Sequence, residues 1–201
     1  MMENIWLQTD EADDVAGSVR HALRCLEMVV QDKQAWKWFA LALHSAIQGA
    51  CVSHLVSTAS PVGAVYPENA AKFLSYFEES RTNPDAKPPE ARIMALPDLL
   101  KAARKPNSAG DGSNSLGIPI TDAELEWLGR FHSTLRNQFV HFEPMGWSLE
   151  VSGLPAMARL VARVLSDILS AGWAFRHKDH EWKVALQAGL QQLAKCETRS
   201  S

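Results

Sequence analysis

The residues best suited to chemistry are an arginine and a histidine, Arg136 and His141, which bracket the run Arg-Asn-Gln-Phe-Val-His at positions 136–141. Histidine exchanges a proton near neutral pH, and arginine presents a planar fork of donors that matches a phosphate group. Asn137, next to the arginine, can donate and accept hydrogen bonds. The three side chains together suggest acid–base chemistry on a phosphodiester.

The element that must position these residues is an amphipathic helix, which we predict over residues 121–142. Thr121 is followed three residues later by Glu124, the capping-box spacing that marks the start of a helix. On a helical wheel the apolar stripe is centred on Leu128, Leu135 and Phe139, with Leu125 and Phe142 at its margins. The other side contains Arg130, Thr134, Asn137 and His141, and Arg136 lies between the two faces. We therefore expect the motif to point away from the core of its own helix.

The spacing alone leaves two interpretations of this polar face. It can belong to a functional surface, cleft or interface. It can equally be an ordinary solvated face, whose last histidine only interacts favourably with the C-terminal end of the helix dipole. A histidine that merely satisfies a core hydrogen bond is expected in or beside the apolar stripe, and His141 lies outside it.

The rest of the chain has helical periodicity almost throughout, apart from residues 59–120. That region contains most of the prolines and a Gly/Ser/Asn-rich run at 107–117, so we expect an irregular insertion with short helices at 68–80 and 97–105. Long helices are predicted over residues 10–31, 32–58, 156–176 and 180–195 in addition to 121–142. The predicted fold is an all-α, antiparallel helical bundle of four to six main helices, with the insertion between the second and third long ones.

Length and composition limit the classes of protein to which such a bundle can belong. With 201 residues, 46% of them hydrophobic, the chain can bury one core, and we expect a single domain over residues 1–201. We predict a cytoplasmic protein with no membrane association and with reduced thiols, because there is no long apolar run, no basic leader and no paired cysteine motif. The net charge of -3 gives no general attraction to a polyanion. Binding a nucleic acid would then depend on a local patch built from Arg130, Arg136, Arg159 and Arg163.

The motif resembles that of the HEPN superfamily, helical-bundle proteins of prokaryotic defence and toxin systems. The hallmark of that family is an arginine, usually followed by a polar residue, with a histidine after four to six intervening positions, and Arg136, Asn137 and His141 match all three elements. The run at 136–150, with its Arg-Asn-x-x-x-His-Phe and Gly-Trp-Ser pattern, also looks like a group of bacterial HEPN-like proteins. The specific resemblance covers mainly residues 121–155 and, more loosely, 36–55.

The resemblance implies a metal-independent endoribonuclease without a cofactor. In that chemistry the RNA 2′-hydroxyl attacks the adjacent phosphate, with His141 as general base or acid and Arg136 stabilising the phosphoryl oxygens, while Asn137 orients the histidine or the phosphate. The resemblance also implies a homodimer whose two motifs face one cleft, and a regulatory partner such as an antitoxin or a nucleotidyltransferase-like protein. Arg130, one helical repeat before the motif, is a candidate substrate-binding arginine. The alternative is a HEPN-like domain without nuclease activity that binds nucleotides or another protein.

The second predicted helix offers further candidates. His44 and Gln48 are expected to line the Arg136/His141 cleft, because neighbouring helices of a bundle pack about 8–10 Å apart. His44, Cys51 and His54 could instead supply zinc ligands, but no fourth ligand accompanies them at a recognisable spacing, and a buried cysteine is most often a small hydrophobe. We therefore predict no metal site.

Overall fold

The computed structural model describes residues 6–58, 60–140, 148 and 150–197, and at 135–137 it describes the backbone alone. Within these residues the regular elements are helices, and the β structure is limited to two isolated bridges, Ser57 with Ser60 and Val65 with Ile93. This confirms the predicted all-α bundle. None of the described helices is long and apolar enough to cross a membrane.

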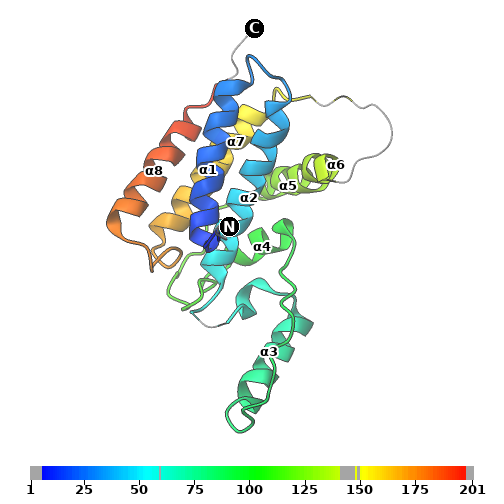
Figure 1. The fold of residues 1–201 in the computed structure, drawn as a ribbon, viewed down its shortest axis with the longest axis vertical. Coiled ribbons are helices and arrows are strands. Elements are labelled where there is room, and N and C mark those ends of the chain that lie inside the picture. The colour runs from blue at the N-terminus through cyan, green and yellow to red at the C-terminus, as the bar shows by residue number, and fades with distance from the viewer. Residues whose placement is uncertain (1–5, 59, 141–147, 149, 198–201) are drawn as a thin grey trace, which may run out of the picture.

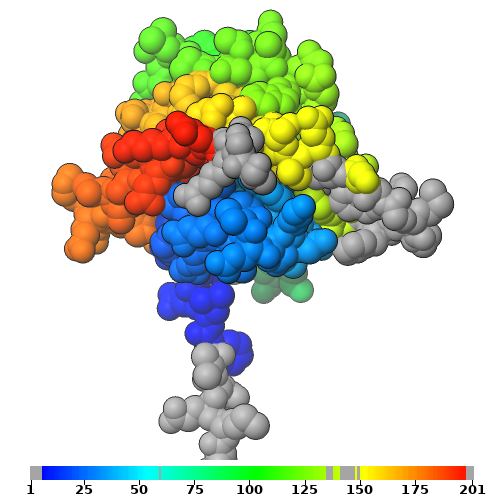
Figure 2. All heavy atoms as spheres, turned by 90° about the horizontal axis from the view of Figure 1, so that it is seen from above, coloured from blue at the N-terminus to red at the C-terminus, as the bar shows by residue number. Residues whose placement is uncertain are grey.

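Four long helices build the bundle: α1 (Glu11–Met28), α2 (Ala35–Leu55), α7 (Leu154–Ser170) and α8 (His180–Ala194). Helix α1 packs against α2 and α8, and α7 packs against the same two helices, so the four surround a common core (Figure 1). In the view from above, the dark blue of α1 lies beside the orange and red of α8 (Figure 2). All four were predicted from periodicity. Helix α7 ends six residues earlier than predicted, at a turn in which Gly172 and Phe175 adopt positive φ angles of 84° and 59°.

The region 59–120 divides into two parts. Its first part contains a short 3-10 helix η1 (Val62–Ala64) and α3 (Pro67–Glu79), which projects from the end of the bundle (Figure 1). Its second part contains α4 (Leu96–Ala103), which packs against α2 and whose residues Leu96, Leu99 and Leu100 are fully buried. The two expected short helices thus exist. Helix α4 belongs to the core of the bundle.

The helix expected at 121–142 is not a regular α-helix. Helix α5 (Asp122–Arg130) is followed without a break by a π-helical turn η2 (Phe131–Arg136) and then by α6 (Asn137–Val140). The predicted capping box is present: Thr121 Oγ1 accepts from the Glu124 backbone N–H at 3.2 Å. A π-helical turn holds more residues than an α-helical one, and such turns occur frequently at functional sites. The prediction of an uninterrupted α-helix was therefore wrong at residues 131–136.

Candidate functional site

The structure distributes the predicted site residues that it describes over α2, α5, η2 and α6. Arg136 is the last residue of η2, and Asn137 is the first residue of α6. His141 lies outside the described residues. His44 and Gln48 lie on α2, where His44 is buried and Gln48, one turn further on, is half-buried.

The most direct link between α2 and η2 is a pair of histidines. Nε2 of His44 and Nδ1 of His132 are 2.8 Å apart, a hydrogen bond between α2 and η2 that joins residues 88 positions apart in the chain. The two imidazole rings are stacked, with centroids 5.1 Å apart and planes inclined by 25°. Phe131, which is buried, lies against His44 at a centroid distance of 6.0 Å. His44 therefore contacts two successive residues of the π-helical turn.

The hydrogen bond limits the charge of the histidine pair. One ring must donate and the other must accept, because two N–H groups cannot face each other at 2.8 Å. The pair can be neutral, or it can hold one positive charge as an imidazolium hydrogen-bonded to an imidazole, which is a charge-assisted bond. His44 is only 7% exposed, whereas His132 is half-buried, so His132 is the ring nearer to solvent.

Arg136 follows His132 by four residues, which is about one turn of the same π-helical segment. The backbone of the predicted phosphate-binding residue thus lies one turn from the histidine pair. Helix α2, which carries His44, packs against η2, the turn that ends at Arg136.

The outer face of α5, η2 and α6 is open to solvent. Arg130, Thr134 and Gln138 are exposed, and Val140 is 45% exposed. Arg130 lies 3.7 Å from Glu126 on the same face, a surface ion pair that leaves its guanidinium accessible. Leu128 and Phe139 are buried as the helical wheel predicted.

Two of the arginines expected to contribute to a basic patch have internal partners. Arg159 donates to the carbonyl of Cys196, after the end of α8. Arg163 lies 2.9 Å from Glu124 and donates to Asp167 at 2.8 Å and to the carbonyl of Pro119. These arginines fix α7 to its neighbours. Of the other two, Arg130 is exposed and the side chain of Arg136 lies outside the described residues.

His44, Cys51 and His54, the residues considered as zinc ligands, all lie on α2. No three His, Cys, Asp or Glu side chains among the described residues lie close enough to hold a metal ion. Complete burial raises the pKa of the Cys51 thiol to about 12, which keeps it in the protonated form that binds metals poorly. His54 is fully buried on α2, away from solvent.

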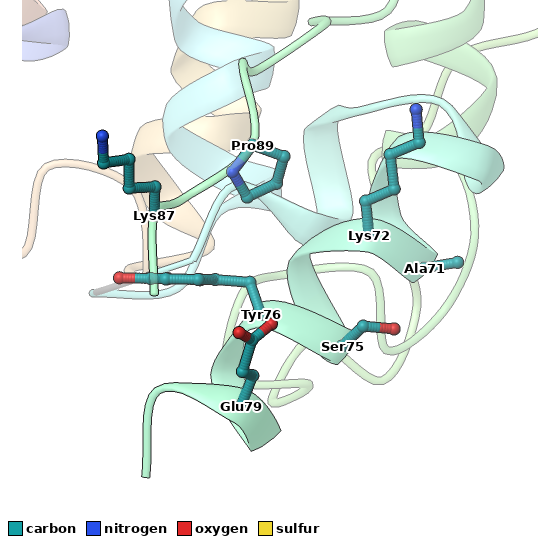
Figure 3. A pocket seen from close by; sticks show the side chains of 7 residues that line it. All are labelled: Ala71, Lys72, Ser75, Tyr76, Glu79, Lys87 and Pro89. Atoms are coloured by element: carbon teal, nitrogen blue, oxygen red, sulfur yellow. The ribbon is translucent and has the colours of Figure 1, made fainter. Parts of the chain in front are cut away.

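An open pocket of about 390 Å³ lies on the projecting helix α3, apart from the motif. Lys72, Tyr76 and Glu79 of α3 face Lys87 and Pro89 of the returning segment across it (Figure 3). The candidate site residues do not line this pocket. Its mixture of lysine and glutamate gives it no single charge.

Sequence reasoning missed His132, although a signal for it was present. His132 is four residues after Leu128 and three before Leu135, which places it inside the apolar stripe of the wheel. A histidine at such a position is expected to form a hydrogen bond within the protein, and a neighbouring helix of the bundle is where its partner would lie.

Comparisons of the chain with protein-family models, with curated proteins and with solved structures find no significant match.

Proposed function

We propose that the protein is a HEPN-like, metal-independent endoribonuclease. The RNA 2′-oxygen attacks the adjacent phosphorus, the bond from phosphorus to the 5′-oxygen breaks, and the products are a 2′,3′-cyclic phosphate and a 5′-hydroxyl. His141 transfers a proton in this reaction, Arg136 stabilises the charge on the phosphoryl oxygens and Asn137 orients the phosphate or the histidine.

The observation that supports this proposal is the His44–His132 hydrogen bond at the turn that ends with Arg136. It adds imidazole groups, which exchange protons near neutral pH, to the segment where the motif provides a phosphate-binding arginine. The π-helical form of that turn is a second supporting feature, because π turns concentrate at functional sites.

Substrate contacts follow from the open face beside the motif. Arg130 is exposed at the end of α5 and is proposed to bind a neighbouring phosphate of the RNA. Gln48, half-buried one turn beyond His44, is proposed to contact the substrate from α2. In a cytoplasmic defence or toxin–antitoxin system, an antitoxin or a nucleotidyltransferase-like partner would hold this activity in check.

The cleavage reaction is tested with the purified protein on total RNA in the presence of EDTA. We expect chelator-resistant cleavage that leaves 5′-hydroxyl ends, and its loss in Arg136→Ala and His141→Ala. His180→Ala, which changes an exposed histidine on α8, is the matched control and should cleave like the unmodified protein. The absence of cleavage of any RNA would favour the alternative, a module that binds nucleotides or protein.

We also propose that the protein is a homodimer that uses the outer face of α5, η2 and α6. An exposed valine, Val140, and the exposed Thr134 and Gln138 lie on this face, beside the motif. Light scattering should give the mass of a dimer, and Val140→Asp should shift it toward the monomer because a buried, unpaired charge is costly. A monomer at all concentrations would contradict the dimer.

A further inference from the structure

We propose that the loop segment 109–111 is a pH-sensitive device, which opens away from the end of α2 when the buried imidazole of His54 takes up a proton. The inference does not depend on the proposed endoribonuclease activity, because it concerns the region where the end of α2, this loop and the turn after α7 meet. It rests on the burial of the ring and on one hydrogen bond that holds the loop against α2.

The ring of His54 is the most unusual polar group in the described part of the core. His54 lies in the last turn of α2, and its side chain is completely buried. Among the described residues, neither ring nitrogen has a hydrogen-bond partner. A neutral imidazole without partners already loses its hydrogen bonds to water, and a charged one loses far more. His54 therefore takes up a proton readily only after part of the structure moves and water reaches the ring.

The loop segment 109–111 is the part that can move with the smallest loss of contacts. The N–H of Gly110 donates to the carbonyl of His54 at 2.9 Å. That carbonyl is one of those at the end of α2 that have no partner within the helix. The residues that follow, 111–113, are exposed. Local opening of such a segment exposes little apolar surface, so it requires less free energy than unfolding of the bundle.

The turn after α7 holds the end of α2 by separate contacts. Trp173 donates from Nε1 to the carbonyl of Val56 at 2.9 Å, and Arg176 donates to Oγ1 of Thr58 at 2.9 Å. The guanidinium of Arg176 also lies over the Trp173 ring, 3.6 Å from its centroid. These contacts do not involve the loop backbone, so the loop can open while residues 56–58 stay in place.

The ionisable groups around His54 come from each of these elements. The charge of Asp111, on the loop, favours the protonated ring, and Arg176, on the turn after α7, acts on Asp111 in turn. Cys51, one turn earlier on α2, stays uncharged because burial raises its pKa to about 12. Burial outweighs the effect of Asp111, so the pKa of His54 lies below 6.5 while the loop is closed.

The sign of the pH dependence follows from the difference between the closed and the open loop. In the open form water reaches the ring, and the pKa of His54 returns toward 6.5. The open form then binds a proton that the closed form does not. Opening therefore becomes more favourable as the pH falls below 6.5 and is independent of pH above it. The opening equilibrium can rise by up to about tenfold for each pH unit.

Hydrogen exchange of the Gly110 amide, followed by NMR, measures the opening, because this N–H is released when the loop opens. Its protection factor, which is corrected for the intrinsic effect of pH on exchange, should fall by up to about tenfold between pH 7.5 and pH 5.5. The amide of Ala70, which donates to the carbonyl of Tyr66 at 2.9 Å at the start of α3, is the control and should keep its protection factor. An unchanged protection factor at Gly110 would overturn the proposal.

Two variants identify the group that takes up the proton. His54→Leu cannot titrate, so its Gly110 amide should be protected equally at both pH values. Asp111→Asn can still accept from the Ser113 N–H but lacks the charge that favours the protonated ring in the closed form, so it should enlarge the fall in protection. A pH dependence that persists in His54→Leu, or disappears in Asp111→Asn, would assign the titration to another group and refute the role of His54.

Low concentrations of urea separate local opening from unfolding of the bundle. Exchange at Gly110 should hardly change with urea below the unfolding transition, because local opening exposes little surface. Exchange at Leu43, which is fully buried in the middle of α2, should accelerate steeply. The same urea dependence for both amides would mean that Gly110 exchanges only when the whole bundle unfolds, and the loop would then not open by itself.

Discussion

Glu124 of α5 and Arg163 of α7 form an ion pair of 2.9 Å that joins the start of the motif helix to the bundle. The same carboxylate closes the capping box of α5, accepting from the backbone N–H of Thr121 at 2.8 Å and from its hydroxyl at 3.0 Å. One side chain, the anchor of the motif helix, therefore fixes both where that helix begins and how it is held against α7.

Removing the anchor should destabilise the protein. We expect Glu124→Ala to lower the free energy of unfolding by about 1–2 kcal/mol, from the lost capping box and the partly exposed ion pair together. Glu126→Ala, on the same helix, removes only a 3.7 Å pair on the surface and should change the free energy by less than about 0.5 kcal/mol. Urea unfolding followed by circular dichroism measures both. Equal losses in the two variants would show that the anchor has no special role.

Asp10 should make the protein sensitive to acid. Partial burial raises the pKa of Asp10, but hydrogen bonds from Lys178, the Asp13 backbone and His177 outweigh it and lower that pKa from 3.8 to about 2. Because the folded state favours the ionised form of Asp10, this carboxylate contributes to the free energy of unfolding. The contribution is fully present above pH 3.8 and is lost as the pH falls from there through 2. The carboxylate is about a third exposed, so we expect a contribution of only about 1 kcal/mol.

Asp10→Asn isolates this charge, because asparagine caps a helix as well as aspartate does. The variant should be less stable than the unmodified protein at pH 6, and the difference should vanish toward pH 2. Asp85→Asn, at an exposed loop position, is the control and should leave the stability unchanged at both pH values. A difference for Asp10→Asn that does not depend on pH would contradict the electrostatic explanation.

His54 should produce a second pH dependence, near neutrality. Its ring is fully buried, and within the described part of the chain neither nitrogen has a hydrogen-bond partner. Burial lowers the pKa of His54 below 6.5, although the charge of Asp111 opposes this. The unfolded chain therefore binds a proton more readily, so the stability is complete above pH 6.5 and falls as the pH decreases below it.

His54→Leu should remove this dependence. We expect it to be as stable as the unmodified protein at pH 7.5, or more stable by about 1 kcal/mol, since no unsatisfied polar group stays buried. At pH 5 the stability of His54→Leu should exceed that of the unmodified protein by more than at pH 7.5, and thermal unfolding at the two pH values measures both differences. His180→Ala again serves as control. An advantage that is the same at both pH values would rule out His54 as the titrating group.

Two glycines should respond to alanine in opposite directions. A Cβ on Gly110 would lie 2.0 Å from the carbonyl oxygen of Val56 and 2.5 Å from Nε1 of Trp173, two atoms that are hydrogen-bonded to each other at 2.9 Å. Gly110→Ala should destabilise the protein by about 1–3 kcal/mol through overpacking. A Cβ on Gly129 in α5 meets nothing within 4 Å, so Gly129→Ala should stabilise by about 1 kcal/mol. The midpoints of denaturant unfolding distinguish the two variants. A lower midpoint in both would show that α5 does not tolerate a side chain at position 129.

Much of the fold could be predicted from local patterns. The capping box of Thr121 and Glu124, the burial of Leu128 and Phe139 and the exposure of Arg130 all follow from spacing on one helix. These features depend on residues within a few turns of one another, which the sequence displays directly. The role of Arg136 and His141 stays a prediction, because it depends on chemistry that helical periodicity does not reveal.

The sequence by itself determined the helices and which face of each is apolar. Only the tertiary structure decided that residues 131–136 form a π-helical turn, that α4 belongs to the core and that His132 bonds to His44. Hydrogen bonds within a helix and side-chain periodicity are set locally, and local sequence predicts them. The hydrogen bond between two side chains 88 residues apart exists only after α2 and η2 pack together, so it depends on the packing of the whole bundle.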